Sequence, residues 1–440
     1  MSQRGFFRLI AMLSIGLFAG TIHAQALDDN SIKANMHNGS DLPTMGTDNT
    51  VSGSGEEQQL QYAAALDGTG LISLGSEVPS HLLWGATVAG GWDSNPENLD
   101  IGVASGIYTL NPYVGIQIST PKTQYLFQYQ LTNTGYTSNY ARQNMNMAST
   151  RILSKLNDRW SLDMGAMGSY GRDSVRFLGS QQTIVVEGVA GIGSGSASYL
   201  PNAGTVTYAD GSIGASYRKS ERDTIKLSAS NSFNRYSGLG ESNSVAALNV
   251  AYARDLSPTF AALIYGQSSS YYGSLRCKNY GGGAGLKWQA SEKTAIALSG
   301  GPQLNTSECG TQQGFAYSAS FSTQFNGKSQ LYLLSSRQPT ASYLGPGLWQ
   351  ESASGGYQRQ VTAIGTISLD VGYVASKTLT TVNSYHGTYV DFIYGYHLSH
   401  GLRASYSYRR YVGDAGGTRF SRNAALFSMV WTSEGNHEVQ

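Results

Sequence analysis

Apolar and polar residues alternate along most of this chain, from about residue 82 to residue 431. In one clear stretch, Phe315, Tyr317, Ala319 and Phe321 are separated by small or polar residues. Successive side chains of a β-strand point to opposite faces, so each such stretch has one apolar face and one polar face. Because the pattern continues without a break, it predicts one large all-β domain rather than several soluble ones.

We count eighteen alternating stretches and expect each to form a strand. The first nine lie near 82–93, 107–119, 124–136, 143–155, 160–172, 205–218, 223–235, 242–254 and 259–271. The other nine lie near 279–290, 294–305, 314–326, 329–337, 350–361, 365–375, 384–397, 402–412 and 419–431.

Short polar turns and longer loops alternate between these stretches. The short turns contain Pro121–Lys122, Asn157–Arg159, Glu221–Arg222, Ser257–Pro258, Glu292–Lys293, Asn326–Lys328, Thr362–Ala363 and Ser399–Gly401. Bacterial outer-membrane barrels have an even number of strands, short periplasmic turns and long outer loops. The rhythm therefore predicts a transmembrane antiparallel up-and-down β-barrel of about 18 strands, within a range of roughly 16 to 20.

The longest predicted loop covers residues 173–204 and would lie on the outer side. Its central segment, Thr183–Val186, is apolar and is followed by a glycine-rich run. An ordinary extracellular loop is the interpretation we favour, because long outer loops are usual in such barrels. An extra hairpin, which would make 20 strands, and a constriction folded into the lumen are the alternatives.

Residues 1–26 have the composition of an export signal. Arg4 and Arg8 precede an apolar stretch, and the small residues Ala24 and Ala26 follow it. Such a segment is typical of a cleaved signal peptide, and its apolar stretch is too short for a good membrane anchor. The alternative is that this segment is retained as a membrane anchor. Export by such a signal, together with the barrel pattern, predicts location in the bacterial outer membrane.

Residues 27–81 are polar and acidic, with eight carboxylates against Lys33, a balance of 1 − 8 = −7. This composition predicts a disordered periplasmic tail, with a plug strand or a small folded module as alternatives. The barrel is expected to occupy 82–432, and 433–440 would form a short C-terminal tail.

Composition and motifs exclude several classes of function. The net charge is +1 and only 13% of residues are charged, so the chain has no electrostatic footprint for nucleic acid. No nucleophile elbow, phosphate-binding loop or metal motif is present, and we expect no enzyme activity, no cofactor and no metal. A barrel lipase using His386 or His397 is the enzymatic alternative.

The only two cysteines, Cys277 and Cys309, fall in predicted outer loops on either side of one hairpin. Both would emerge at the same rim, and an oxidising compartment favours their pairing. The sequence therefore predicts a disulfide, with two free thiols as the alternative.

Charged residues within the predicted strands are expected on the inner wall, because a charge facing lipid at mid-membrane costs about 2 to 4 kcal/mol. Such lumen-lining residues would bias a water-filled path weakly toward anions. Alternatively they pair and close the lumen. Tyr389 and Tyr411 are candidates for stacking on sugars, or simply rim aromatics. The seven predicted lumen-lining charges are Asp163, Lys226, Lys287, Asp370, Asp391, Arg403 and Arg409.

The segment Gly91–Asn95 reads Gly-Trp-Asp-Ser-Asn. It resembles the aromatic-Asp-Ser-Asn stretch near the start of outer-membrane β-barrel porins of the porin-2 type. The stretch ending at Trp431 is similar to a barrel-assembly signal, although Thr432–Gln440 follow it. The resemblance implies a channel, an encounter with the barrel-assembly machinery and, for some members, a link to exopolysaccharide export.

Together these patterns predict an outer-membrane channel for passive diffusion or export of polar solutes, with polysaccharide as one candidate. The expected partners are outer-membrane lipid, the solute and the assembly machinery, and the barrel would be a monomer or a homotrimer. The alternative is a surface scaffold or adhesin with a closed lumen and partner-binding extracellular loops.

Overall fold

A computed structural model describes residues 80–96, 100–138, 140–172, 205–237, 242–273, 276–291, 293–306, 313–325, 328–342, 345–377, 384–399, 402–415 and 417–432. The first nine strands are β1 (Ser80–Asp93), β2 (Ser105–Ser119), β3 (Thr123–Tyr136), β4 (Gln143–Lys155), β5 (Trp160–Gly171), β6 (Thr205–Arg218), β7 (Asp223–Ser237), β8 (Asn243–Ser257) and β9 (Phe260–Tyr272). The other nine are β10 (Cys277–Ser291), β11 (Thr294–Asn305), β12 (Gln313–Gln324), β13 (Ser329–Ser342), β14 (Gly345–Gln360), β15 (Gly365–Lys377), β16 (Ser384–Ser399), β17 (Leu402–Ala415) and β18 (Thr418–Thr432).

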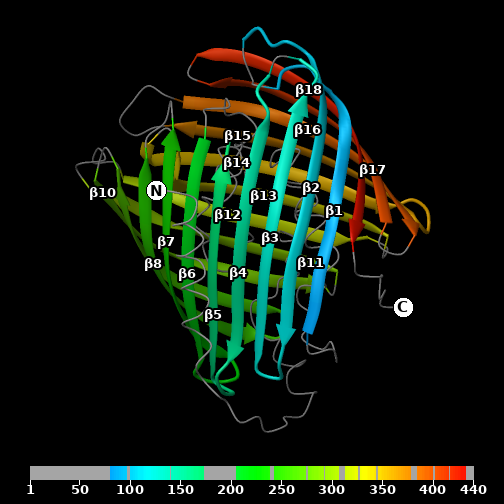
Figure 1. The fold of residues 1–440 in the computed structure, drawn as a ribbon. Coiled ribbons are helices and arrows are strands. Elements are labelled where there is room, and N and C mark those ends of the chain that lie inside the picture. Colours follow the sequence, from blue (N-terminus) through cyan, green and yellow to red (C-terminus); the bar gives the residue numbers. More distant parts are fainter. Residues whose placement is uncertain are drawn as a thin grey trace, which may run out of the picture. The chain divides into compact units, whose positions relative to one another are not determined.

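These strands form one closed antiparallel barrel (Figure 1). Each strand pairs with the next along the chain, and β1 pairs with β18 from Gly85↔Thr432 to Asp93↔Ala424. Closure leaves no unpaired sheet edge among the described strands. The predicted 18-strand up-and-down architecture is thus confirmed. None of the described residues form a helix long and apolar enough to cross a membrane.

The strand bounds follow the alternation closely, and β4, β6 and β11 begin and end where predicted. The largest differences are at β13 and β14, which meet at Ser342 and Gly345, where the sequence predicted a long outer loop over 338–349. Proline normally ends a strand because it cannot donate to the ladder, but Pro339 stays in register with Trp349.

A second expected outer loop is also a tight connection. β17 ends at Ala415 and β18 begins at Thr418, and Gly417 adopts a φ of 85°. A left-handed backbone of this kind suits glycine and allows the chain to reverse within two residues. The predicted alternation of short and long connections is therefore wrong at these two places. The predicted long loop at 173–204 lies outside the described residues.

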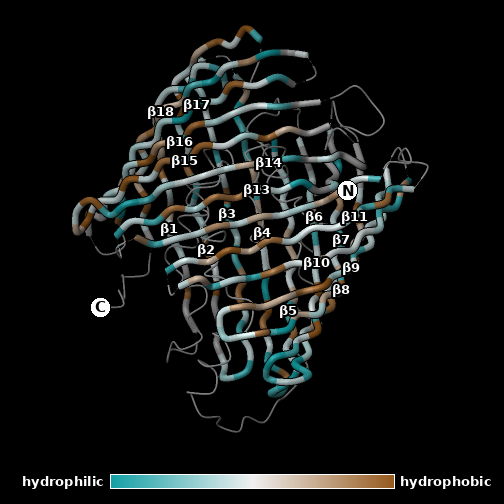
Figure 2. Tube along the Cα trace, turned by 180° about the vertical axis from the view of Figure 1, so that it is seen from behind, coloured by the Kyte–Doolittle hydropathy of each residue, from teal (hydrophilic) through white to brown (hydrophobic). Residues whose placement is uncertain are grey.

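The two faces of each strand differ in the way the sequence predicted. On β2, Tyr108 and Leu110 are exposed on the outer face, whereas Thr109 and Asn111 are buried on the inner face. Figure 2 shows apolar and polar residues interleaved along the strands in this manner. The outer wall is therefore a broad apolar surface and the inner wall is largely polar.

Four of the six tryptophans lie near the short-turn end of the barrel, the end where β2 is joined to β3. Trp84, Trp160, Trp288 and Trp431 each stand within four residues of a strand terminus at that end. All four are exposed, and the rings of Trp84 and Trp431 meet edge to face at 4.4 Å. Such a girdle is typical of a membrane interface.

Candidate functional site on the inner wall

A row of inner-wall residues crosses β13 to β17 at adjacent register positions; we name it the charged row. In order around the wall it contains Tyr332, Gly356, Asp370, Asp391 and Arg409. Gly356 has no side chain, so the ring of Tyr332 lies over it, and the Tyr332 hydroxyl donates to Asp370. A missing side chain on one strand thus lets residues two strands apart meet.

Within the charged row, Asp391 and Arg409 form a buried ion pair. Nε and one terminal nitrogen of Arg409 donate to Oδ2 of Asp391 at 2.8 and 2.7 Å, and both side chains are 2% exposed. Burial of charge is costly unless the charges are paired. Asp370 stands directly opposite Asp391, so the row holds two carboxylates and one guanidinium.

A second row lies beside the first. Tyr389 and Tyr411 face each other across β16 and β17 with ring centroids 6.2 Å apart, and both are buried. The ring of Tyr389 lies over Gly372, as Tyr332 lies over Gly356. Buried tyrosines packed in this way form part of the wall, which leaves little ring surface for stacking on a sugar.

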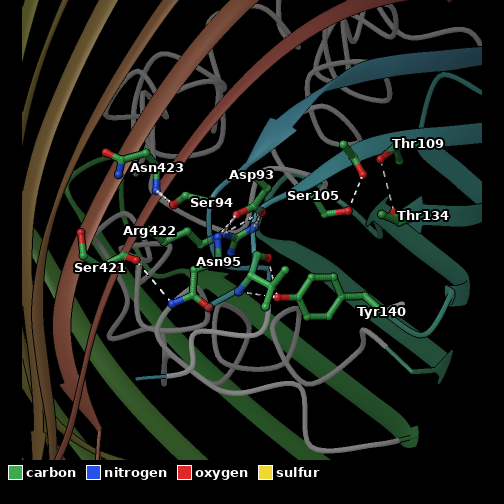
Figure 3. A network of polar contacts seen from close by, with 12 residues as sticks. Asp93, Ser94, Asn95, Ser105, Thr109, Thr134, Tyr140, Ser421, Arg422 and Asn423 are labelled. Atoms are coloured by element: carbon green, nitrogen blue, oxygen red, sulfur yellow. Dashed lines mark hydrogen bonds and ion pairs between the residues drawn. The ribbon is translucent and has the colours of Figure 1, made fainter. Parts of the chain in front are cut away.

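The second row ends at the seam of the barrel, where β1 meets β18 (Figure 3). Arg422 donates to both carboxylate oxygens of Asp93, with the closest distance 2.5 Å, and the two side chains are 2% and 0% exposed. The backbone N–H of Ser94 donates to the carbonyl of Asn423, and the N–H of Asn423 donates to Oγ of Ser94. We call Asp93, Ser94, Arg422 and Asn423 the seam clasp.

The contacts of the seam clasp explain what the polar residues of the Trp-Asp-Ser-Asn segment do in the structure. Asp93 Oδ1 also accepts the N–H of Asn95, and the Asn95 amide donates to the carbonyl of Ser421. The segment therefore turns the chain at the end of β1 while binding the strand that closes the barrel (Figure 3).

The inner wall carries mostly neutral polar groups on two other sides. On β1 to β4 the side chains of Thr87, Asn111, Gln130, Thr134 and Gln143 are almost fully buried. Thr109 and Thr134 lie 3.3 Å apart through their hydroxyl oxygens (Figure 3).

On β9 to β11, amide side chains bond in pairs. Gln267 donates to Gln303 at 3.1 Å, and Asn279 donates to Asn305 at 2.7 Å. Hydroxyl and amide groups of this kind offer both donors and acceptors to polar molecules.

The seven predicted lumen-lining charges lie on the strand faces opposite the exposed apolar side chains but do not form one ring, and their contact with an open lumen stays a prediction. Asp370, Asp391 and Arg409 are neighbours in the charged row. The other four, nearer the short-turn end, are Asp163, Lys226, Lys287 and Arg403. Asp163 is bound by Arg151 through two hydrogen bonds, and both side chains are about half exposed.

Arg422 was missed as a candidate site residue by sequence reasoning, and Asp93 was noticed only within its motif. The alternation along β18 would have placed Arg422 on the inner wall. Ala425, Phe427 and Met429 face outward, so the even-numbered residues of this strand face inward. The pairing itself has no sequence signal, because 329 positions separate the two residues. Tyr332 was missed because its partner Asp370 stands two strands away.

The structure describes only some of the predicted cysteine and histidine candidates. Cys277 is disulfide-bonded, while Cys309 lies outside the described residues, so the pairing between them stays a prediction. His386 is exposed on the outer face of β16. Over the described ranges no group of three or more metal-ligating side chains is found.

Comparisons with known proteins give only distant likenesses. No family model matches the chain, and no curated protein matches it. Among solved structures, OccAB2 of Acinetobacter baumannii is 9% identical, with 80% of this chain and 97% of that one covered at a TM-score of 0.45. OpdK, an outer-membrane protein of Pseudomonas aeruginosa, is 6% identical, with coverages of 80% and 99% and a TM-score of 0.44.

A third structure, a bacterial polysaccharide outer-membrane secretin, is 8% identical, with coverages of 81% and 99% and a TM-score of 0.36. The barrel architecture itself is given by the strand pairing described above. The resemblance to porins of the porin-2 type stays a prediction.

Proposed function

We propose that this protein is a channel in the bacterial outer membrane for passive diffusion or export of polar solutes. Its membrane placement is supported by the outer wall, where large apolar side chains are exposed on strand after strand. A soluble monomer rarely exposes so large an apolar surface. The tryptophan girdle at the short-turn end matches an interface with water, and that end would face the periplasm.

The observation that carries the channel proposal is the chemistry of the inner wall. Paired charges lie on β16, β17, β18 and β1, and neutral amides and hydroxyls line β1 to β4 and β9 to β11. A wall of this kind suits hydrated, polar cargo rather than lipid. Polysaccharide fits this chemistry, as do smaller polar solutes.

Planar-bilayer recording tests the channel proposal. Refolded protein should give stepwise conductance, and the same protein unfolded by boiling should give none. A variant lacking residues 173–204 tests whether this segment blocks conduction through the lumen. If neither the full chain nor the deletion variant conducts, the channel assignment is wrong.

The second candidate is a surface scaffold with a closed lumen. It is favoured by the near-complete burial of the Asp391–Arg409 and Asp93–Arg422 pairs, because buried inner-wall charges are shielded from bulk water. The recording separates the candidates, since a scaffold would fold and insert without conducting.

A further inference from the structure

We propose that the outer wall of β17 and β18 binds the phosphate of an outer-leaflet lipid headgroup, mainly through Arg410 and secondarily through Arg419. The inference rests on the membrane placement proposed above, but not on conduction. It concerns the outside of the barrel, whereas the proposed channel concerns the inside.

Arg410 is a charge on the apolar side of the barrel wall. It is exposed and lies between Arg409 and Tyr411, which are both buried, so it faces outward. It is the ninth residue of β17, with five more before the strand ends at Ala415. A basic side chain facing lipid costs about 2 to 4 kcal/mol at the midplane and less near the interface, so it needs an anion or water within reach.

The neighbours of Arg410 supply no anion. Across the strands it stands opposite Val390 and Asn423, and along β17 its outward neighbours are Tyr408 and Val412. No ion pair joins Arg410 to any residue in the described part of the chain.

Two other outward arginines of the barrel have an acidic partner. Arg337 is also the ninth residue of its strand, β13, and its Nε lies 3.2 Å from a carboxylate oxygen of Glu351. Near the short-turn end, Arg254 lies 3.9 Å from Asp223. The charge of Arg337, at the equivalent strand position, is thus neutralised by an acidic side chain of the barrel itself. The charge of Arg410 is left for an external anion.

The surroundings of Arg410 suit a phosphorylated amphiphile. Asn423 and the exposed Ser421 offer an amide and a hydroxyl beside it, and Arg419 is exposed four residues before Asn423 on β18. Guanidinium groups bind phosphate through paired hydrogen bonds. One acid is close: Asp414 stands opposite Arg419 and its Oδ1 accepts the N–H of Gly417 at 2.9 Å, but no ion pair joins Asp414 to Arg419 in the described part of the chain.

Aromatic side chains cover the outer wall between Arg410 and the short-turn end of the barrel. Tyr406 and Phe427 face outward with ring centroids 4.9 Å apart, and Tyr408 is exposed above them. These rings would contact acyl chains while the arginines hold the phosphate. The arrangement matches a lipid headgroup better than a free anion.

Native mass spectrometry in detergent tests the proposal. The refolded chain is incubated with bisphosphorylated lipid A, with its dephosphorylated form, or with lipid A plus inorganic phosphate in molar excess. The wild type should retain the phosphorylated lipid, and Arg410→Gln with Arg419→Gln should reduce the retained fraction about tenfold, as expected for the loss of charge-assisted hydrogen bonds.

The matched control is Arg359→Gln, which removes an exposed outward arginine from the opposite end of the barrel on β14 and should retain lipid like the wild type. Arg410→Lys keeps the charge, should fold even if the double variant does not, and should bind at an intermediate level. Retention of the phosphorylated lipid by the double variant at the wild-type level, equal binding of dephosphorylated lipid, or displacement by inorganic phosphate would overturn the proposal.

Conductance measured on the same preparations separates the two proposals. A barrel that retains the phosphorylated lipid without conducting would support this inference while removing the channel function. A chain that stays in solution without detergent would remove the membrane placement, and with it the lipid site.

Discussion

At the scale of single residues, the ion pair of the seam clasp is the most consequential contact. Asp93 and Arg422 are both almost fully buried and lie on the two strands that close the barrel. Breaking a buried pair by removing one partner typically costs about 3 to 5 kcal/mol, because an uncompensated charge is left behind. The same change in an exposed pair costs little, with a median of about 0 to 1 kcal/mol.

We therefore expect Asp93→Asn to lower the temperature at which the folded barrel converts to the unfolded band on an SDS gel. Asp163→Asn is the matched control, because its partner Arg151 is about half exposed, and it should have a much smaller effect. Equal shifts for the two variants would argue against a structural role for the clasp.

At the scale of strands, the charged row depends on glycine at one position of β14. A Cβ on Gly356 would overlap the ring of Tyr332, which reaches across to Asp370 on β15. Overpacking of this kind typically costs about 1 to 3 kcal/mol. At Gly211 on β6 the nearest atom to such a Cβ is 3.9 Å away.

Gly356→Ala should therefore destabilise the barrel toward urea, whereas Gly211→Ala should change the midpoint much less. Combining Gly356→Ala with Tyr332→Ala removes the overlap, so the double variant should be less destabilised than the sum of the single changes. Additive midpoint shifts would mean that the ring and the glycine are not coupled.

At the scale of the whole molecule, the distribution of charge inside the barrel sets the expected ion preference. Lys226 and Lys287 occupy inner-wall positions on β7 and β10, nearer the short-turn end than the buried ion pairs. Half-exposed charges on a water-filled path act on passing ions, while a charge buried from water acts much less. The lysines should therefore contribute a weak preference for anions.

Reversal potentials in a salt gradient check this expectation. Lys226→Glu combined with Lys287→Glu should shift the preference toward cations. Lys278→Glu is the control, because Lys278 is exposed on the outer face of β10, and it should leave the reversal potential nearly unchanged. An unchanged potential in the double variant would show that these side chains do not face the ion path.

By itself, the sequence determined the strand content, the strand count and the inner and outer faces, because a period of two along the chain is a local property of neighbouring residues. It also predicted inner-wall positions for Asp370, Asp391 and Arg409, since their neighbours in sequence face outward. It failed at Pro339, where strand pairing extends past a residue that usually ends a strand, and at Gly417, where a left-handed glycine lies in a tight turn instead of a long loop.

Only the tertiary structure decided which polar side chains meet. Asp93 finds Arg422 because barrel closure brings the first and last strands together, and Tyr332 reaches Asp370 because the strand between them presents glycine. Both contacts depend on how far each strand is shifted along its neighbour. That shift is fixed by the pairing of all eighteen strands together, and no local pattern of residues encodes it.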